Sequence, residues 1–140
     1  MILIQPWQDA QAAAYPIRKR VFIEEQGVPE AMELDEFDPM AQHALAYIDS
    51  ECVGTARLVT LAGNIGRIGR MAVLATYRKQ GIGTQLLNSL IERSKFLGLT
   101  QLELHAQLSA IPFYEKFGFI GQGAIYDEAG IPHRDMILRI

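Results

Sequence analysis

Residues 70–98 constrain the fold of this chain more than any other part of its sequence. A strand-like run, RMAVLA, is followed by the glycine-containing turn Arg78-x-x-Gly81-x-Gly83 and then by a long amphipathic stretch. The apolar residues of that stretch recur at the spacing of one helical face, and Gly98 supplies a stop signal. A strand, a tight turn and an amphipathic helix in this order predict a helix packed on a sheet, which is the layer arrangement of α/β domains. The residues of the predicted helical face are Ile82, Leu86, Leu87, Leu90, Ile91 and Leu97.

The segment before this unit predicts one helix and several strands. Residues 2–4 favour an opening strand, and Asp9 can cap a helix that runs toward Glu25, with Pro16 as a kink or break. Acidic residues and prolines interrupt any periodicity over residues 27–39, so this segment is predicted to be a loop. Runs rich in β-formers then predict a three-stranded meander over residues 43–49, 52–62 and 67–75.

The segment after the helix completes the sheet. Residues 100–106 predict a strand and residues 110–118 a short helix. Residues 119–127 and 132–140 predict a closing hairpin around Glu128-Ala129-Gly130. The order strand, helix, three strands, helix, strand, helix and hairpin predicts an α/β fold with a mixed sheet.

Length and composition predict one domain over residues 1–140. Apolar residues make up 49% of the chain and charged residues 21%, which excludes a disordered chain. No apolar run approaches the ~20 residues that span a bilayer, and the N-terminus lacks the features of a secretion signal. Cys52 is the only cysteine, so no internal disulfide can form. We therefore expect a cytoplasmic protein without membrane contact.

Charge is divided unevenly along the chain. Residues 21–56 contain nine acidic residues and no Lys or Arg, whereas residues 57–91 contain five basic residues and no acid. Two interpretations are open. The two segments can be separate solvated surfaces, or they can serve two ligands of opposite sign, an anion on the second and a cation near the first.

The turn at residues 78–84 has the chemistry of a phosphate-binding site. Backbone N–H groups that lead into a helix form a concave set of donors, and the helix dipole adds about half a positive charge at the same end. A Cβ at Gly81 or Gly83 would keep a pyrophosphate from the backbone, and Arg78 and Lys79 supply full charges. The turn is neither a Walker loop, which needs Lys and Ser/Thr after the second glycine, nor a dinucleotide fingerprint, which needs glycine where Leu86 stands.

The turn, the strand QLELHA at 101–106 and the segment AIPFYEKFGF at 110–119 together resemble the GNAT superfamily of N-acetyltransferases. The similarity is strong over residues 66–126, and residues 18–38 and the segment GIPHRDM resemble the bacterial ElaA-like branch. The resemblance implies a GNAT-like mixed, mostly antiparallel central sheet with a V-shaped splay, flanked by helices.

The same resemblance implies acetyl-CoA as the acyl donor, with its pyrophosphate on the turn and its pantetheine arm along the strand that contains residues 71–73. One departure concerns Gln107, since many family members carry Asn near this position. The residues implied to bind the donor are Met71, Ala72, Val73, Arg78, Lys79, Gln80, Gly81, Ile82, Gly83, Thr84, Gln107 and Phe113.

An amine that attacks a thioester must be neutral, and the departing thiolate must be protonated. The resemblance implies Tyr114 as the general acid, against the alternative of a core aromatic. The general base stays open between His105, His133 and Glu103, with Glu25 and Glu36 or a water relay as alternatives. Backbone N–H groups of residues 71–73 can polarise the carbonyl.

The acidic segment is predicted to attract a small-molecule or peptide amine through Glu25, Glu33, Asp35 and Glu36. A non-catalytic acyl-CoA-binding module is the alternative function, although Tyr114 favours an enzyme. The net charge of −3 and the lack of an aromatic-basic pattern argue against nucleic acid as a partner. The histidines and Cys52 have no metal-ligand spacing, so no metal is expected. The acceptor's identity, the acyl-chain preference and a homodimer stay open.

Overall fold

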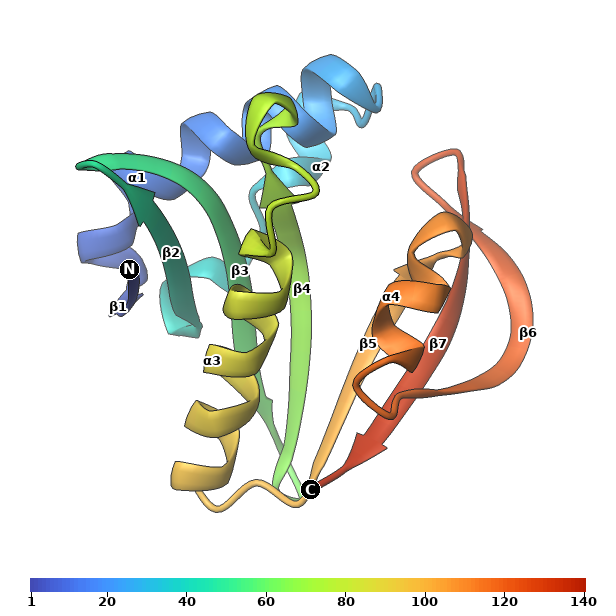
Figure 1. Cartoon of the computed structure of the whole chain (residues 1–140). Helices are drawn as coiled ribbons and strands as arrows, with labels where there is room; N and C mark the ends of the chain where they lie inside the picture. The colour runs from blue at the N-terminus through green and yellow to red at the C-terminus, as the bar shows by residue number, and fades with distance from the viewer.

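One seven-stranded sheet, in the order β1-β2-β3-β4-β5-β7-β6, organises the computed structural model, which describes residues 1–140 (Figure 1). Every neighbouring pair of strands is antiparallel except β4 and β5, which are parallel. The predicted mixed, mostly antiparallel sheet is therefore confirmed. The strands are β1 (Ile2–Pro6), β2 (Gln42–Ile48), β3 (Glu51–Leu61), β4 (Ile65–Val73), β5 (Gln101–Gln107), β6 (Ile120–Glu128) and β7 (Ile131–Arg139).

Helices cover both faces of this sheet because side chains alternate along its strands. On β2, Leu45 packs against Trp7 of the first helix, whereas Ala44 and Ala46 belong to the core beneath the long helix. The helices and helical turns are α1 (Trp7–Arg18), η1 (Lys19–Glu25), α2 (Glu30–Glu33), η2 (Asp38–Met40), η3 (Ala75–Tyr77), α3 (Ile82–Phe96), η4 (Leu108–Ala110) and α4 (Ile111–Glu115).

The long helix α3 confirms the prediction from periodicity except at Leu97, which follows the helix and is exposed. Leu86, Leu87 and Leu90 are fully buried against the sheet, and Gly98 follows the helix end with φ of +79°. The chain then returns to β5 past Gly66, which allows a close approach. A Cβ at Gly66 would lie 2.8 Å from Leu102 and 2.9 Å from Leu99, so a larger residue would push the core apart.

The first helical segment begins earlier than predicted and reaches Glu25, as predicted, through α1 and η1. It starts at Trp7 directly after Pro6, so Asp9 is not the cap but an acid in the first turn, where the helix dipole favours it. Pro16 does not end the helix. The α-helix continues to Arg18, and η1 then widens to π-type turns, with the Gln26 N–H donating to the Val21 carbonyl.

The segment predicted as a loop at 27–39 contains two short helical turns, α2 and η2. Glu33 in α2 and Asp38 in η2 are both bonded to the buried guanidinium of Arg18. The loop prediction was incomplete because local periodicity carries no information about an arginine 15 or 20 residues away.

The two strands at the centre of the sheet separate toward one end. β4 pairs with β5 only from Ile65 to Ile68, opposite residues 101–104, whereas beyond this point Gly69, Ala72 and Val73 have partners on β3 alone. Figure 1 shows β4 and β5 starting together near the C-terminus and diverging from there. A bulge in β4 lies within this free stretch, where Arg70 adopts φ of +50°. The predicted V-shaped splay is therefore confirmed.

Candidate active site

A pocket of about 680 Å³ lies at the opening between the two halves of the sheet. Its walls come from β4, from β5 and the β6–β7 hairpin, from α4, and from the segment that joins α1 to β2. It brings together many of the residues predicted from the sequence, namely Glu33, Asp35, Met71, Ala72, Val73, Arg78, His105, Gln107, Phe113, Tyr114 and His133. Other predicted residues lie outside its walls, namely Glu25, Glu36, Lys79, Gln80, Gly81, Ile82, Gly83, Thr84 and Glu103.

The glycine turn forms the N-terminal end of α3. Lys79 and Gly81 have φ of +63° and +81°, and the first helical hydrogen bond runs from the Gln85 N–H to the Gly81 carbonyl at 3.0 Å. The N–H groups of residues 82–84 precede this bond and therefore have no intrahelical acceptor. Ile82 contributes only its backbone here, since its side chain is buried in the core.

Space above this turn suits a bulky anion. A Cβ on Gly81 would meet no atom within 4 Å, so the space in front of that backbone is open. A Cβ on Gly83 would lie 3.5 Å from the ring of Phe113, which places this aromatic side chain beside the turn. Free N–H groups at a helix N-terminus with open space in front of them fit a phosphate group.

Arg78 connects the turn to the pocket. Its Nε donates to the Val73 carbonyl at 2.8 Å, and its Nη2 donates to Glu25 at 3.0 Å. Glu25, predicted to contact the acceptor, thus lies against Arg78 at the mouth of the pocket. The next glutamine, Gln80, donates to the Thr76 carbonyl at 3.3 Å and closes the η3 turn.

Tyr114 projects from α4 toward the free edge of β4. Its hydroxyl lies 4.0 Å from the Met71 sulfur, and its ring meets Phe113 and Phe119 edge-on. Burial raises the pKa of Tyr114 to about 12, so the phenol keeps its proton at neutral pH. A protonated phenol beside an unpaired strand edge can donate to a group that binds along β4.

The acidic and basic segments of the chain neutralise each other within the fold. Arg18 bonds Glu33 at 2.7 Å and Asp38 at 2.8 Å, and all three side chains are almost fully buried. Arg57 bonds Asp35 at 2.7 Å and Asp38 at 3.1 Å. Neither interpretation of the charge pattern anticipated this pairing, because each treated the two segments as separate surfaces. Asp35 and Glu33 line the pocket, but their carboxylates already form ion pairs with arginines.

The same network reaches the bulge of β4. Arg70 donates from Nη2 to Asp35 at 3.1 Å and to the Glu33 carbonyl at 3.1 Å, and its Nε lies 3.2 Å from the Glu33 carboxylate. Burial raises the pKa of Glu33 more than the neighbouring arginines lower it. The bulge residue is thus fixed at both its backbone and its side chain. Glu36, the fourth predicted acid, is exposed beyond this network.

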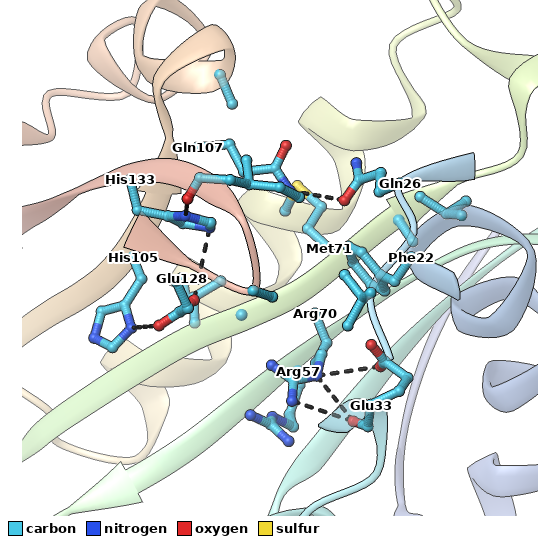
Figure 2. A pocket seen from close by; sticks show the side chains of 18 of the residues that line it. Phe22, Gln26, Glu33, Arg57, Arg70, Met71, His105, Gln107, Glu128 and His133 are labelled. Carbon is cyan, nitrogen blue, oxygen red and sulfur yellow. Dashed lines mark hydrogen bonds and ion pairs between the residues drawn. The ribbon is translucent and has the colours of Figure 1, made fainter. Parts of the chain in front are cut away.

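The histidines and Glu103 take different places on the β5–β7 side. Glu103 is opposite Arg67 across the parallel strands and accepts two of its hydrogen bonds, at 2.8 and 3.0 Å. Figure 2 shows His105 and His133 on either side of Glu128. His105 Nδ1 lies 3.2 Å and His133 Nε2 3.6 Å from the two oxygens of that carboxylate.

Two polar residues of the pocket were missed by sequence reasoning. Glu128 was assigned to the turn of the closing hairpin, and its position next to GIPHRDM was the only available signal. Gln26 lies at the end of η1 and accepts a hydrogen bond of 2.9 Å from Gln107 (Figure 2). This bond joins the two sides of the opening, and no local pattern predicts a contact over 81 residues.

None of the helices is long and apolar enough to cross a lipid bilayer.

Comparisons with known proteins agree on one family. Residues 7–140 match the family model described as an acetyltransferase (GNAT) domain. The uncharacterized protein YyaT of Bacillus subtilis is 42% identical over 123 residues, which cover 86% of this chain and 82% of YyaT. Among solved structures, an acyl-CoA N-acyltransferase from Pseudomonas aeruginosa superposes with a TM-score of 0.88 at 27% identity, covering 98% of this chain and 97% of that one. Escherichia coli ElaA superposes with a TM-score of 0.85 at 28% identity, covering 98% and 99%.

Proposed function

This chain belongs to the GNAT acetyltransferase family, and we propose that it transfers the acetyl group of acetyl-CoA to a primary amine by direct attack in a ternary complex. One observation carries the proposal. Arg78, which begins the glycine turn before α3, and the unpaired edge of β4 line the same pocket as Tyr114. A diphosphate and an extended amide-containing arm are the parts of a CoA ester that such a turn and such an edge recognise.

Donor binding would use backbone groups more than side chains. The N–H groups of residues 82–84 and the charges of Arg78 and Lys79 would hold the diphosphate. The N–H and C=O groups of residues 69–73 that point away from β3 would pair with the amides of the pantetheine arm as a neighbouring strand does, except the Val73 carbonyl, which accepts from Arg78. Phe113 beside Gly83 would pack against that arm. Gln107 would contact it only after releasing Gln26.

Transfer requires one new bond and the loss of another. The amine nitrogen attacks the carbonyl carbon, the C–N bond forms and the C–S bond breaks, with the electron pair leaving on sulfur. Tyr114 would give its hydroxyl proton to that sulfur, and the base would remove a proton from the amine. N–H groups of the β4 bulge would stabilise the negative charge on the carbonyl oxygen, and one such donor is typically worth about 3 kcal/mol. Holding the reactants together contributes about 7–11 kcal/mol, so positioning outweighs any single group.

The proposal is tested by release of free CoA from acetyl-CoA in the presence of a panel of primary amines. We expect amine-dependent thiol release that saturates with both reactants, and loss of binding heat for CoA when Gly81 is replaced by tryptophan. Saturable CoA binding without transfer to any amine would show that the protein is a non-catalytic acyl-CoA-binding module and not an enzyme. Absence of binding heat with any CoA ester would refute the proposal entirely.

A further inference from the structure

The carboxylates that line the pocket differ in the side chains to which they are bonded. Glu33 and Asp35 are each bonded to arginines, which offset their charge. Glu128 has contacts with histidines only, His105 at 3.2 Å and His133 at 3.6 Å. Glu128 is thus the one pocket carboxylate whose negative charge no arginine or lysine offsets. A cationic group entering the pocket would meet this charge first.

The neutral tautomer of His133 is determined by the hydrogen bond that its Nδ1 makes. Nδ1 lies 2.6 Å from the Ile131 carbonyl oxygen, which can only accept, so Nδ1 carries the hydrogen. In the neutral ring Nε2 is therefore an acceptor, and it faces Oε2 of Glu128 at 3.6 Å. Unless the ring itself gains a proton at Nε2, these two facing acceptors leave a place for a hydrogen-bond donor between them. The ring is almost fully buried, and Tyr126 packs nearly parallel to it, so it cannot turn away.

His105 holds the other oxygen of the same carboxylate. Its Nδ1 lies 3.2 Å from Oε1 of Glu128, its Nε2 lies 3.8 Å from Asp135, and its ring meets Tyr126 edge-on. A neutral imidazole can donate from Nδ1 to Glu128, which leaves Oε2 for the pocket. The structure brings together no group of three or more His, Cys, Asp or Glu side chains that could hold a metal ion. An ammonium group, which has several N–H bonds, can donate to both of these acceptors at once.

We propose that Glu128 and His133 together receive the ammonium group of the acceptor and that His133 Nε2 takes its proton. This inference rests on the proposed transfer to a primary amine. One N–H bond of the ammonium breaks, its electron pair stays on the amine nitrogen, and the proton bonds to Nε2. Glu128 offsets the imidazolium that forms, much as a carboxylate supports the histidine of a catalytic triad. The pair selects an aliphatic primary amine, which is cationic at neutral pH and donates three N–H bonds.

Two amines separate proton removal from the rest of the reaction. Butylamine is an ammonium at neutral pH, whereas hydroxylamine is already neutral and needs no base before attack. We expect Glu128→Gln and His133→Asn to lower kcat/KM for butylamine by about 10²–10⁴-fold, the range for general base catalysis, and for hydroxylamine by less than about threefold. Asparagine at position 133 keeps an N–H for the Ile131 carbonyl. Glu92→Gln, which removes an exposed carboxylate of α3 outside the pocket, is the matched control and leaves both rates unchanged.

Equal losses with both amines, or no loss with either, would overturn the assignment. A second measurement is independent of turnover. In protein labelled with ¹⁵N-histidine, butylammonium should shift the Nε2 resonance of His133 in the wild type and not in Glu128→Gln. A wild type that transfers to neither amine but shows this shift would refute the proposed transfer and keep the receiving site. An unmoved resonance would overturn the receiving site while leaving transfer to be judged by CoA release.

Discussion

Replacing Asp38 by asparagine should destabilise the protein by about 2–3 kcal/mol at neutral pH. The Asp38 carboxylate accepts from Arg18 Nη1 at 2.8 Å, from Arg57 Nη1 at 3.1 Å and from the Asp35 N–H at 3.1 Å. Burial alone would raise its pKa, but these donors and charges outweigh burial and lower the pKa from 3.8 to about 2. At about 1.4 kcal/mol per unit, this shift is worth about 2–3 kcal/mol to the ionised form. Asparagine has the shape of the protonated acid and loses that amount.

The sign of the pH dependence follows from the lowered pKa. Between about pH 4 and pH 2 the unfolded chain binds a proton at Asp38 that the folded chain does not, so stability falls as the pH falls through this window. Above pH 4 the full contribution is present. The neighbouring Glu33 acts in the opposite sense because its pKa is raised. The contribution of Asp38 is therefore the difference in the free energy of unfolding between the wild type and Asp38→Asn, measured at each pH.

Urea unfolding at pH 7, 4 and 2.5 measures this difference. With a slope of about 1.5 kcal/mol per molar urea, the midpoint of the variant should lie about 1.5 M below that of the wild type at pH 7, and the two should converge toward pH 2. Asp49→Asn, on an exposed hairpin, is the control and should follow the wild type. A constant difference in midpoint between Asp38→Asn and the wild type at all three pH values would show that the lost stability does not come from the charge.

Three further results are expected. Tyr114→Phe should lower kcat about 10²–10⁴-fold, as loss of a general acid does, with little change in CoA affinity by calorimetry, and an unchanged kcat in single-turnover assays would remove the acid role. Gly81→Trp should abolish CoA binding, whereas Gly98→Trp, which has a similar positive φ and open space at the other end of α3, should lose stability only and retain binding. Gly66→Val should destabilise by about 1–3 kcal/mol in urea unfolding, because its side chain would overlap Leu102, and a wild-type midpoint would contradict the packing.

Much of the fold could be predicted because its elements are encoded locally. The apolar stripe from Ile82 to Ile91 fixes α3 by its period, and the polar tip at Asp49 and Ser50 forms the hairpin turn with both residues at positive φ. Helix boundaries were less predictable. The helix α1 begins directly after Pro6, whereas Asp9 was expected to cap it. Either residue can begin a helix, and only the position at which β1 ends decides between them.

The candidate site was predictable only in part, because its contacts join residues far apart in the chain. The splay of β4 from β5 was predicted from the family resemblance, because hydrophobic periodicity identifies strands and carries no information about the angle between them. The arginines that hold Glu33 and Asp35 lie in another segment, so an acid-rich run gave the appearance of a free cation site. Glu128 could be recognised as a site residue only from its contact with His105, which the β5–β7 pairing places next to it.

The free edge of β4 also bears on the order of events in a catalytic cycle. Over residues 69–73 this strand has no partner on β5, so the backbone groups there that point away from β3 face the gap in the sheet. A thioester seated there would act as the missing strand and form one wall of the chamber that Glu128 and His133 border. The second reactant would then find a complete chamber only after the first has docked, which leads us to expect compulsory-order kinetics with the thioester as leading substrate and free CoA as the last product to leave.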